Sequence, residues 1–260
     1  MGSTATVLNS YRKFLESIPL DKFRDKFKDV KWVEQDLYKE LLPQSSIFRH
    51  YWHEQNFLDF ESWFEDFWTE LNSNAASKTA LKDFKKYYFD KDNDGWFKLG
   101  FKARMYRTWT AVLTQLDFCY MFAYVCEKKG KKVTLEANAE LDISGIDLRV
   151  GDIDFEVGKL TQRKEARSAA ITRRNRIRIP YAVFNVDEYE RKSHSSRVSP
   201  TSRASYRNAL QAFHKYFLIL KNGFVVFSEY YVDQVVSNLS NPEKLKTKVE
   251  KLLTELSGEF

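Results

Sequence analysis

The residues best suited to chemistry are acidic side chains in a short segment that reads as a β-hairpin. Apolar and charged residues alternate over 146–150 and again over 153–157, and Gly151-Asp152 separates the two runs. Such alternation is typical of half-buried strands, and two-residue loops that begin with glycine favour tight hairpins. The expected cross-strand pairs are Val150 with Ile153, Arg149 with Asp154, and Leu148 with Phe155.

This hairpin would also place two carboxylates side by side. Asp147 lies opposite Glu156 in the predicted register, and like charges in directly opposed positions repel each other. A bound divalent cation would relieve the repulsion, and carboxylate oxygens suit Mg²⁺, which takes one or two carboxylates and keeps several waters. Asp142, just upstream, could add a third acidic group. The alternative is a surface hairpin whose charged pairs only stabilise the strands.

Lys159 would bring an amine to this site only if the strand is interrupted before it. Strict alternation puts Lys159 on the apolar face, away from Glu156. Gly158 could interrupt the alternation, since glycine at positive φ is a common first residue of a β-bulge. A bulge adds one residue and changes the face on which the next side chain lies. We therefore predict a bulge at Gly158 that returns the Lys159 amine to the carboxylate side.

A dense basic run follows the hairpin and predicts contact with phosphates. The chain has a net charge of +6, and between Lys159 and Arg178 basic residues stand against Glu165 alone. Basic patches of this density bind nucleic-acid backbones, while Arg also pairs with guanine, and Asn and Gln with adenine. The alternative is that several of these arginines only solvate a surface. The candidate DNA-binding residues are Gln162, Arg163, Arg167, Arg173, Arg174, Asn175 and Arg176.

The first half of the chain is predicted to be helical. Its length of 260 residues allows a sizeable core, and its 43% hydrophobic content excludes wholesale disorder. Residues 1–30, with a break at Pro19, and the segments 57–71 and 97–126 show helical spacing. We interpret the aromatic stripe of 57–71 as a core face and not as a base-stacking surface, because aromatic residues at helical spacing are usually buried.

The last third mixes strands, helices and one basic loop. Residues 177–181 alternate as a strand that we expect to stop at Pro180. Residues 191–207, rich in Ser, Arg and Lys, are interpreted as a flexible surface loop that orders on nucleic acid. The further expected elements are a helix over 206–220, a buried strand over 224–227, and a terminal helix from Pro242.

Targeting signals and cysteine usage favour a cytoplasmic protein. No stretch approaches the length of a membrane span, and the N-terminus lacks the apolar core of a signal peptide. Cys119 and Cys126 lie seven apart on one expected helical face. We interpret them as small apolar packers in a reducing compartment and not as a disulfide.

With Asp142, Asp147, Glu156 and Lys159 identified, the region resembles the metal-dependent nuclease core written PD-(D/E)xK. The whole chain resembles the TaqI family of type II restriction endonucleases, through segments that occur in the same order over nearly its full length. These segments are 33–37, 50–52, 104–115, 118–120, 140–147, 179–181 and 222–232.

The resemblance implies a restriction-endonuclease-like α/β (α+β) core, in which a small mixed β-sheet is flanked by many helices. It also implies a single endonuclease domain over residues 1–260. Within that domain we expect a mostly helical part (1–130), a catalytic sheet and DNA-binding part (131–232), and a C-terminal helix (233–260).

The resemblance further implies that Asp142 and Asp147 are active-site acids and that Lys159 is the catalytic lysine. One member of the family carries Gln at the position of Glu156 and Lys at that of Gly158. Glu156 should therefore strengthen metal binding, and the lysine role rests on Lys159 alone. The implied activity is Mg²⁺-dependent cleavage of double-stranded DNA at a short palindrome such as TCGA. A homodimer and a cognate DNA methyltransferase in the same prokaryotic system are implied partners.

Two other functions fit the same residues. A non-catalytic DNA-binding protein would use the basic segment while its carboxylates only stabilise the hairpin. A structure-specific repair nuclease of the same core would cut at branches or lesions instead of at a fixed sequence. Cleavage of a plasmid with and without Mg²⁺ separates the first from a nuclease, and the positions of the cut ends separate the second.

Overall fold

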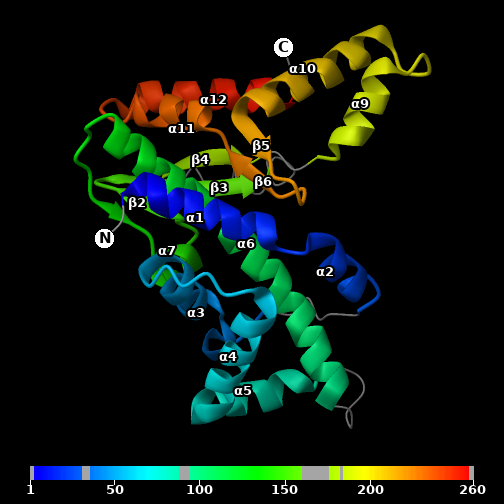
Figure 1. Cartoon of the computed structure of the whole chain (residues 1–260), viewed down its shortest axis with the longest axis vertical. Coiled ribbons are helices and arrows are strands. Elements are labelled where there is room, and N and C mark those ends of the chain that lie inside the picture. Colours follow the sequence, from blue (N-terminus) through cyan, green and yellow to red (C-terminus); the bar gives the residue numbers. More distant parts are fainter. Residues whose placement is uncertain (1–2, 31–35, 88–93, 160–175, 182–183, 258–260) are drawn as a thin grey trace.

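Helices dominate the computed structural model, and two small sheets lie among them (Figure 1). The described residues are 3–30, 36–87, 94–159, 176–181 and 184–257. The helices are α1 (Thr4–Ser17), α2 (Leu20–Phe27), α3 (Gln44–Phe48), α4 (Phe60–Ser73), α5 (Ala75–Lys85), α6 (Asp94–Lys128), α7 (Ala139–Ile143), α9 (Val186–His194), α10 (Pro200–Tyr216), α11 (Glu229–Val236) and α12 (Pro242–Ser257), with short turns η1 (Lys39–Leu41) and η2 (Arg49–His53). The strands are β1 (Leu135–Glu136), β2 (Leu148–Val150), β3 (Ile153–Lys159), β4 (Arg176–Tyr181), β5 (Phe217–Ile219) and β6 (Val225–Phe227).

The larger sheet is mixed and has the order β1-β2-β3-β4. Its first two pairings are antiparallel, and β4 runs parallel to β3. β2 and β3 form the predicted hairpin around Gly151-Asp152, and the three predicted pairs of that hairpin are confirmed. β5 and β6 form a separate hairpin. The predicted fold class, a small mixed sheet flanked by many helices, is confirmed.

One face of the larger sheet packs against a helix, and the other is partly exposed to solvent. One face packs on α6, where Phe118 and Phe122 have ring centroids 6.1 and 5.5 Å from that of Phe155 in β3. This packing buries the apolar half of the strand alternation, as expected for a sheet with one face in the core. The other face keeps partial contact with solvent and carries Arg149, Asp154, Glu156, Arg176 and Arg178.

β4 continues through Pro180 to Tyr181, so the predicted stop at Pro180 was wrong. The reason is that β4 is the last strand of its sheet among the described residues. The Pro180 carbonyl accepts a hydrogen bond from the Tyr231 hydroxyl at 2.9 Å, on the side away from β3. Because the N and C=O of a strand residue point the same way, the missing N–H of Pro180 also faces away from β3 and no ladder bond is lost.

The helical part follows the predicted pattern. Pro19 separates α1 from α2, and α4 buries Phe60, Trp63, Phe64 and other members of its aromatic stripe in the core. The interpretation of that stripe as a core face is therefore confirmed. Cys119 and Cys126 are buried and free in α6. None of the described helices combines the length and the apolar composition that a membrane span requires.

The segment 191–207 is not a loop; it belongs to a helical hairpin of α9 and α10 that projects from the body (Figure 1). Its serines have structural roles that composition alone does not reveal. The Ser199 hydroxyl accepts the N–H of Ser202 at 3.1 Å as the N-cap of α10, and Pro200 occupies the first turn. Ser193 is buried between the helices. We call this pair of helices the basic arm.

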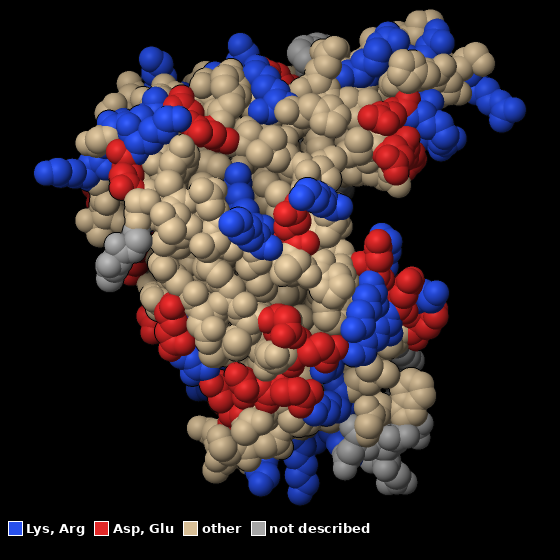
Figure 2. Space-filling view, in the orientation of Figure 1, with Lys and Arg blue, Asp and Glu red and all other residues tan. Residues whose placement is uncertain are grey.

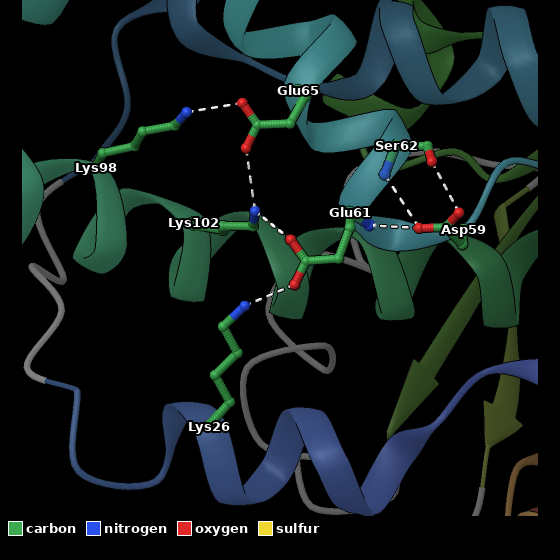
Figure 3. A network of polar contacts seen from close by, with 7 residues as sticks. All are labelled: Lys26, Asp59, Glu61, Ser62, Glu65, Lys98 and Lys102. Carbon is green, nitrogen blue, oxygen red and sulfur yellow. Dashed lines mark hydrogen bonds and ion pairs between the residues drawn. The ribbon is translucent and has the colours of Figure 1, made fainter.

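An ion-pair network holds α2, α4 and α6 together (Figure 3). The Lys102 amine of α6 contacts the carboxylates of both Glu61 and Glu65 in α4. Lys26 of α2 binds the other oxygen of Glu61 at 2.6 Å, and Lys98 binds Glu65 at 2.7 Å. The Lys102 side chain is only 10% exposed, so its charge depends on these two carboxylates.

Replacement of Lys102 by alanine should therefore destabilise the protein by about 2–3 kcal/mol, because it leaves two neighbouring carboxylates without their shared cation. Urea unfolding followed by circular dichroism measures the change. The matched control is Lys98→Ala, which removes an ion pair to the same Glu65 from a side chain that is 36% exposed. That variant should lose less than about 1 kcal/mol. Equal losses in the two variants would contradict a special role for the buried amine.

Candidate active site

The turn after α7 brings two acidic residues together. The helix ends in a Schellman motif, in which the N–H of Ile146 donates to the carbonyl of Leu141 at 2.8 Å and the N–H of Gly145 donates to that of Asp142 at 2.8 Å. Gly145 has φ of 76°, a left-handed conformation that favours glycine. The chain reverses there, so that Asp147 returns beside Asp142.

Asp147 is held at the point where β2 begins. Its N–H donates to the carbonyl of Phe155 at 2.8 Å, and its carboxylate accepts the N–H of Val157 in β3. The ladder of β2 therefore stops at Leu148, and Asp147 does not form the predicted pair with Glu156. The Asp147 carboxylate takes the place of a ladder carbonyl and satisfies a backbone donor of β3.

Asp142 and Asp147 form a buried carboxylate pair. Their side chains share a hydrogen bond, and Asp147 is only 3% exposed. Burial, followed by the charge of Asp142, raises the pKa of Asp147 well above its usual range. Burial also raises the pKa of Asp142. Because two such groups cannot both be charged cheaply, they share a proton when no cation is bound.

Two glutamines complete this cluster, and the sequence interpretation assigned neither a role. The side chains of Gln44 in α3 and Gln115 in α6 lie close enough to Asp142 to offset part of the rise in its pKa. The Oε1 atom of each glutamine is buried and has no hydrogen-bond partner. Gln115 could have been noticed as a polar residue within the buried face of a long helix. Gln44 carries no sequence signal, because only the fold brings α3 to α7.

Glu156 has a different partner from the two residues of the carboxylate pair. Its carboxylate forms an ion pair with Arg176 of β4 at 2.8 Å, and Arg176 also donates to the carbonyl of Gly145. Both side chains are more than half buried. Arg176 therefore ties β4 to the turn after α7. Its predicted contact with DNA stays a prediction.

The predicted bulge at Gly158 was wrong. The parallel ladder between β3 and β4 runs without interruption from Asp154 to Lys159, with Gly158 opposite Pro180 and Lys159 opposite Tyr181. By strand alternation, Lys159 therefore shares a face of the sheet with Val157 and not with Glu156. The N–H of Val157 is the group that binds Asp147. A glycine in the strand was not enough to insert a residue, because the register of β3 with β4 stays continuous on both sides of Gly158. The role of Lys159 stays a prediction.

The other candidate DNA-binding residues lie outside the described residues. They are Gln162, Arg163, Arg167, Arg173, Arg174 and Asn175. Their role in binding remains a prediction from the sequence.

The sequence comparisons identify the family to which this geometry belongs. The TaqI restriction endonuclease family matches residues 8–239. The chain belongs to this family. It is 34% identical over 250 residues to the type II restriction enzyme TaqI of Thermus aquaticus, a match that covers 90% of this chain and 89% of TaqI. It is 33% identical over 239 residues to the type II restriction enzyme TthHB8I of Thermus thermophilus, covering 87% of this chain and 85% of that enzyme. None of the solved structures matches it significantly.

The donor set of this TaqI-family chain fits a hard divalent cation. Asp142, Asp147 and the glutamine Oε1 atoms offer oxygen only, and Mg²⁺ takes one or two carboxylates with waters. The described residues contain no group of three or more His, Cys, Asp or Glu side chains arranged to hold a metal ion. Glu156 instead pairs with Arg176. The cluster therefore fits a cation held by two carboxylates more closely than the predicted set of three.

The carboxylate pair should make the stability of the metal-free TaqI-family fold depend on pH. Since the folded-state pKa of Asp147 is raised, the native state keeps a proton that the unfolded chain loses, and stability falls as pH rises above the ordinary pKa of an aspartate, about 4. Asp147→Asn removes this titration. Urea unfolding with a chelator present measures the stability of both proteins. The stability of the wild type relative to that of Asp147→Asn should fall as the pH rises. Added Mg²⁺ should restore the lost stability in the wild type only.

The matched control is Asp152→Asn in the exposed hairpin turn. Its stability should change with pH in parallel with that of the wild type. Parallel curves for Asp147→Asn as well would mean that the carboxylate pair does not share a proton.

Proposed function

We propose that this TaqI-family protein is a Mg²⁺-dependent type II restriction endonuclease that hydrolyses both strands of DNA at a short palindrome, such as TCGA. The observation that supports this most directly is the buried pair of Asp142 and Asp147 at the base of a hairpin, where a backbone N–H of β3 donates to Asp147. Two carboxylates that share a proton form a site that a divalent cation would occupy in exchange for that proton.

The reaction joins a water oxygen to phosphorus and breaks the bond from phosphorus to the 3′-oxygen. The water loses a proton and the leaving 3′-oxygen gains one, so that the products carry 5′-phosphate and 3′-hydroxyl ends. Asp142 and Asp147 would hold Mg²⁺, which supplies Lewis-acid chemistry that stabilises charge on the phosphate oxygens and favours ionisation of water.

The chain's own groups prepare this site. Gln44 and Gln115 lower the cost of a charge on Asp142, and the Val157 N–H orients the carboxylate of Asp147. This fixed geometry lowers the cost of arranging charges during the reaction. Lys159 would either help to deprotonate the attacking water or stabilise the charge that develops on the phosphate.

Asp147→Ala and Lys159→Ala should each lower the rate of DNA cleavage in Mg²⁺ by at least about 100-fold, because each removes a group that acts on the reacting phosphate or its cation. Single-turnover cleavage of a plasmid measures the rates. Asp152→Ala, which removes an exposed carboxylate of the hairpin turn, should cut like the wild type. Cleavage at the wild-type rate by either of the first two variants would remove the corresponding role.

The products separate the remaining alternatives. A non-catalytic DNA-binding protein would leave the plasmid intact with and without Mg²⁺. A structure-specific repair nuclease would cut branched or damaged DNA in preference to intact duplex. Sequencing the cut ends on a DNA of known sequence should instead give one fixed palindrome.

The basic arm is a described surface that supports contact with DNA phosphates. Residues 191–207 include five basic residues and no Asp or Glu. Acidic side chains lie nearer the root of α9, and Lys and Arg extend toward its tip (Figure 2). The arm begins at Val186, five residues after β4 ends, so it is rooted within about 18 Å of the carboxyl end of the strand beside β3. Arg191, Arg197 and Arg207 are exposed on it.

Loss of an arm arginine should weaken DNA binding about equally for all sequences. Arg197→Gln should reduce the slope of log affinity against log salt concentration by about 1, because one phosphate contact is lost. Fluorescence anisotropy with cognate and unrelated duplexes measures both quantities. Lys244→Gln, at an exposed position of α12, is the control and should leave the slope unchanged. An unchanged slope for Arg197→Gln would remove the arm from the binding surface.

A palindromic target matches a two-fold homodimer in which each subunit cuts one strand. In a restriction system, a cognate methyltransferase in the same bacterial cytoplasm would protect the host's own sites. Both partners are part of the proposal.

A further inference from the structure

The guanidinium of Arg178 occupies the space that a side chain at position 158 would fill. A Cβ built on Gly158 would lie 2.6 Å from the Cζ of Arg178, well inside contact distance. Arg178 stands on β4 opposite Glu156, so both residues belong to the polar face of the sheet. Gly158 therefore allows the guanidinium to lie directly against the backbone of β3.

Gly158 directly follows the residue whose backbone holds Asp147. The residue before Gly158 is Val157, whose N–H binds the Asp147 carboxylate. Successive Cα atoms are about 3.8 Å apart, so the backbone that the guanidinium covers at Gly158 is one residue from the backbone group that holds Asp147. The neighbouring arginine of β4, Arg176, is committed to Glu156 and to the Gly145 carbonyl.

We propose that Arg178 contacts the phosphate that is cut, and that Gly158 makes room for it. A planar guanidinium presents paired N–H donors that match two phosphate oxygens, and its charge is permanent. Gly158, two positions after Glu156 on β3, has no side chain. The guanidinium of Arg178 on the adjacent strand places a cation in that space. This inference rests on the proposed nuclease function and adds a residue to its machinery.

Arg178→Gln should lower the single-turnover cleavage rate at saturating protein by about 100-fold, with a change of less than about tenfold in DNA affinity. Guanidinium ion added to Arg178→Ala should restore part of the lost rate, a response that a purely structural role would not give. Arg149→Gln is the matched control. It removes an arginine of the same face that pairs with Asp154, and it should cut like the wild type.

Gly158→Ala tests the positioning. The added methyl group meets the end of a flexible side chain, so the fold should survive while the guanidinium is displaced. The cleavage rate should fall by about tenfold in the wild-type background and should not fall further in an Arg178→Ala background. The fold of each variant is checked by its urea midpoint.

The outcomes distinguish this inference from the proposed function. A wild-type protein that does not cut DNA in Mg²⁺ would overturn both. Cleavage by the wild type together with an equal rate for Arg178→Gln would overturn the role of Arg178 alone. An equal effect of Gly158→Ala in both backgrounds would likewise overturn the link between Gly158 and Arg178.

Discussion

The cost of burying two carboxylates side by side governs the local structure of the site. Asp142 and Asp147 are tolerated because polar groups reach them from separate parts of the chain: the Val157 N–H of β3 donates to Asp147, and Gln44 of α3 and Gln115 of α6 lie near Asp142. A buried acidic pair is seldom a gain in stability over apolar packing. Its presence, with its donors already in place, is consistent with a site shaped for a positively charged ligand.

Much of this arrangement could be predicted where the pattern is local. The alternation around Gly151-Asp152 predicted the hairpin register because the side-chain period of a strand fixes which residues face each other. The partner of Asp147 could not be predicted in the same way. Its position depends on the Schellman turn at Gly145, which closes Asp147 onto Asp142, while Glu156 is satisfied by Arg176 of another strand.

Other errors arose where tertiary contacts decide the structure. The serines of 191–207 suggested a loop, but Ser199 caps a helix and Ser193 is buried between α9 and α10. Gln44 had no visible pattern because its role depends on the approach of α3 to α7. A polar residue at such a junction is recognised only when its partners are in place.

Pro180 has a further consequence for how two copies of the chain could meet. In the part of the chain that the structure describes, β4 is the outer strand of the larger sheet, and outer strands invite intermolecular pairing when their backbone groups are free. On that side Pro180 offers no donor, and its carbonyl is already taken by Tyr231. A strand of a second molecule that paired with β4 would therefore find neither a donor nor a free acceptor at Pro180. A continuous sheet formed with a second molecule is thus disfavoured at Pro180.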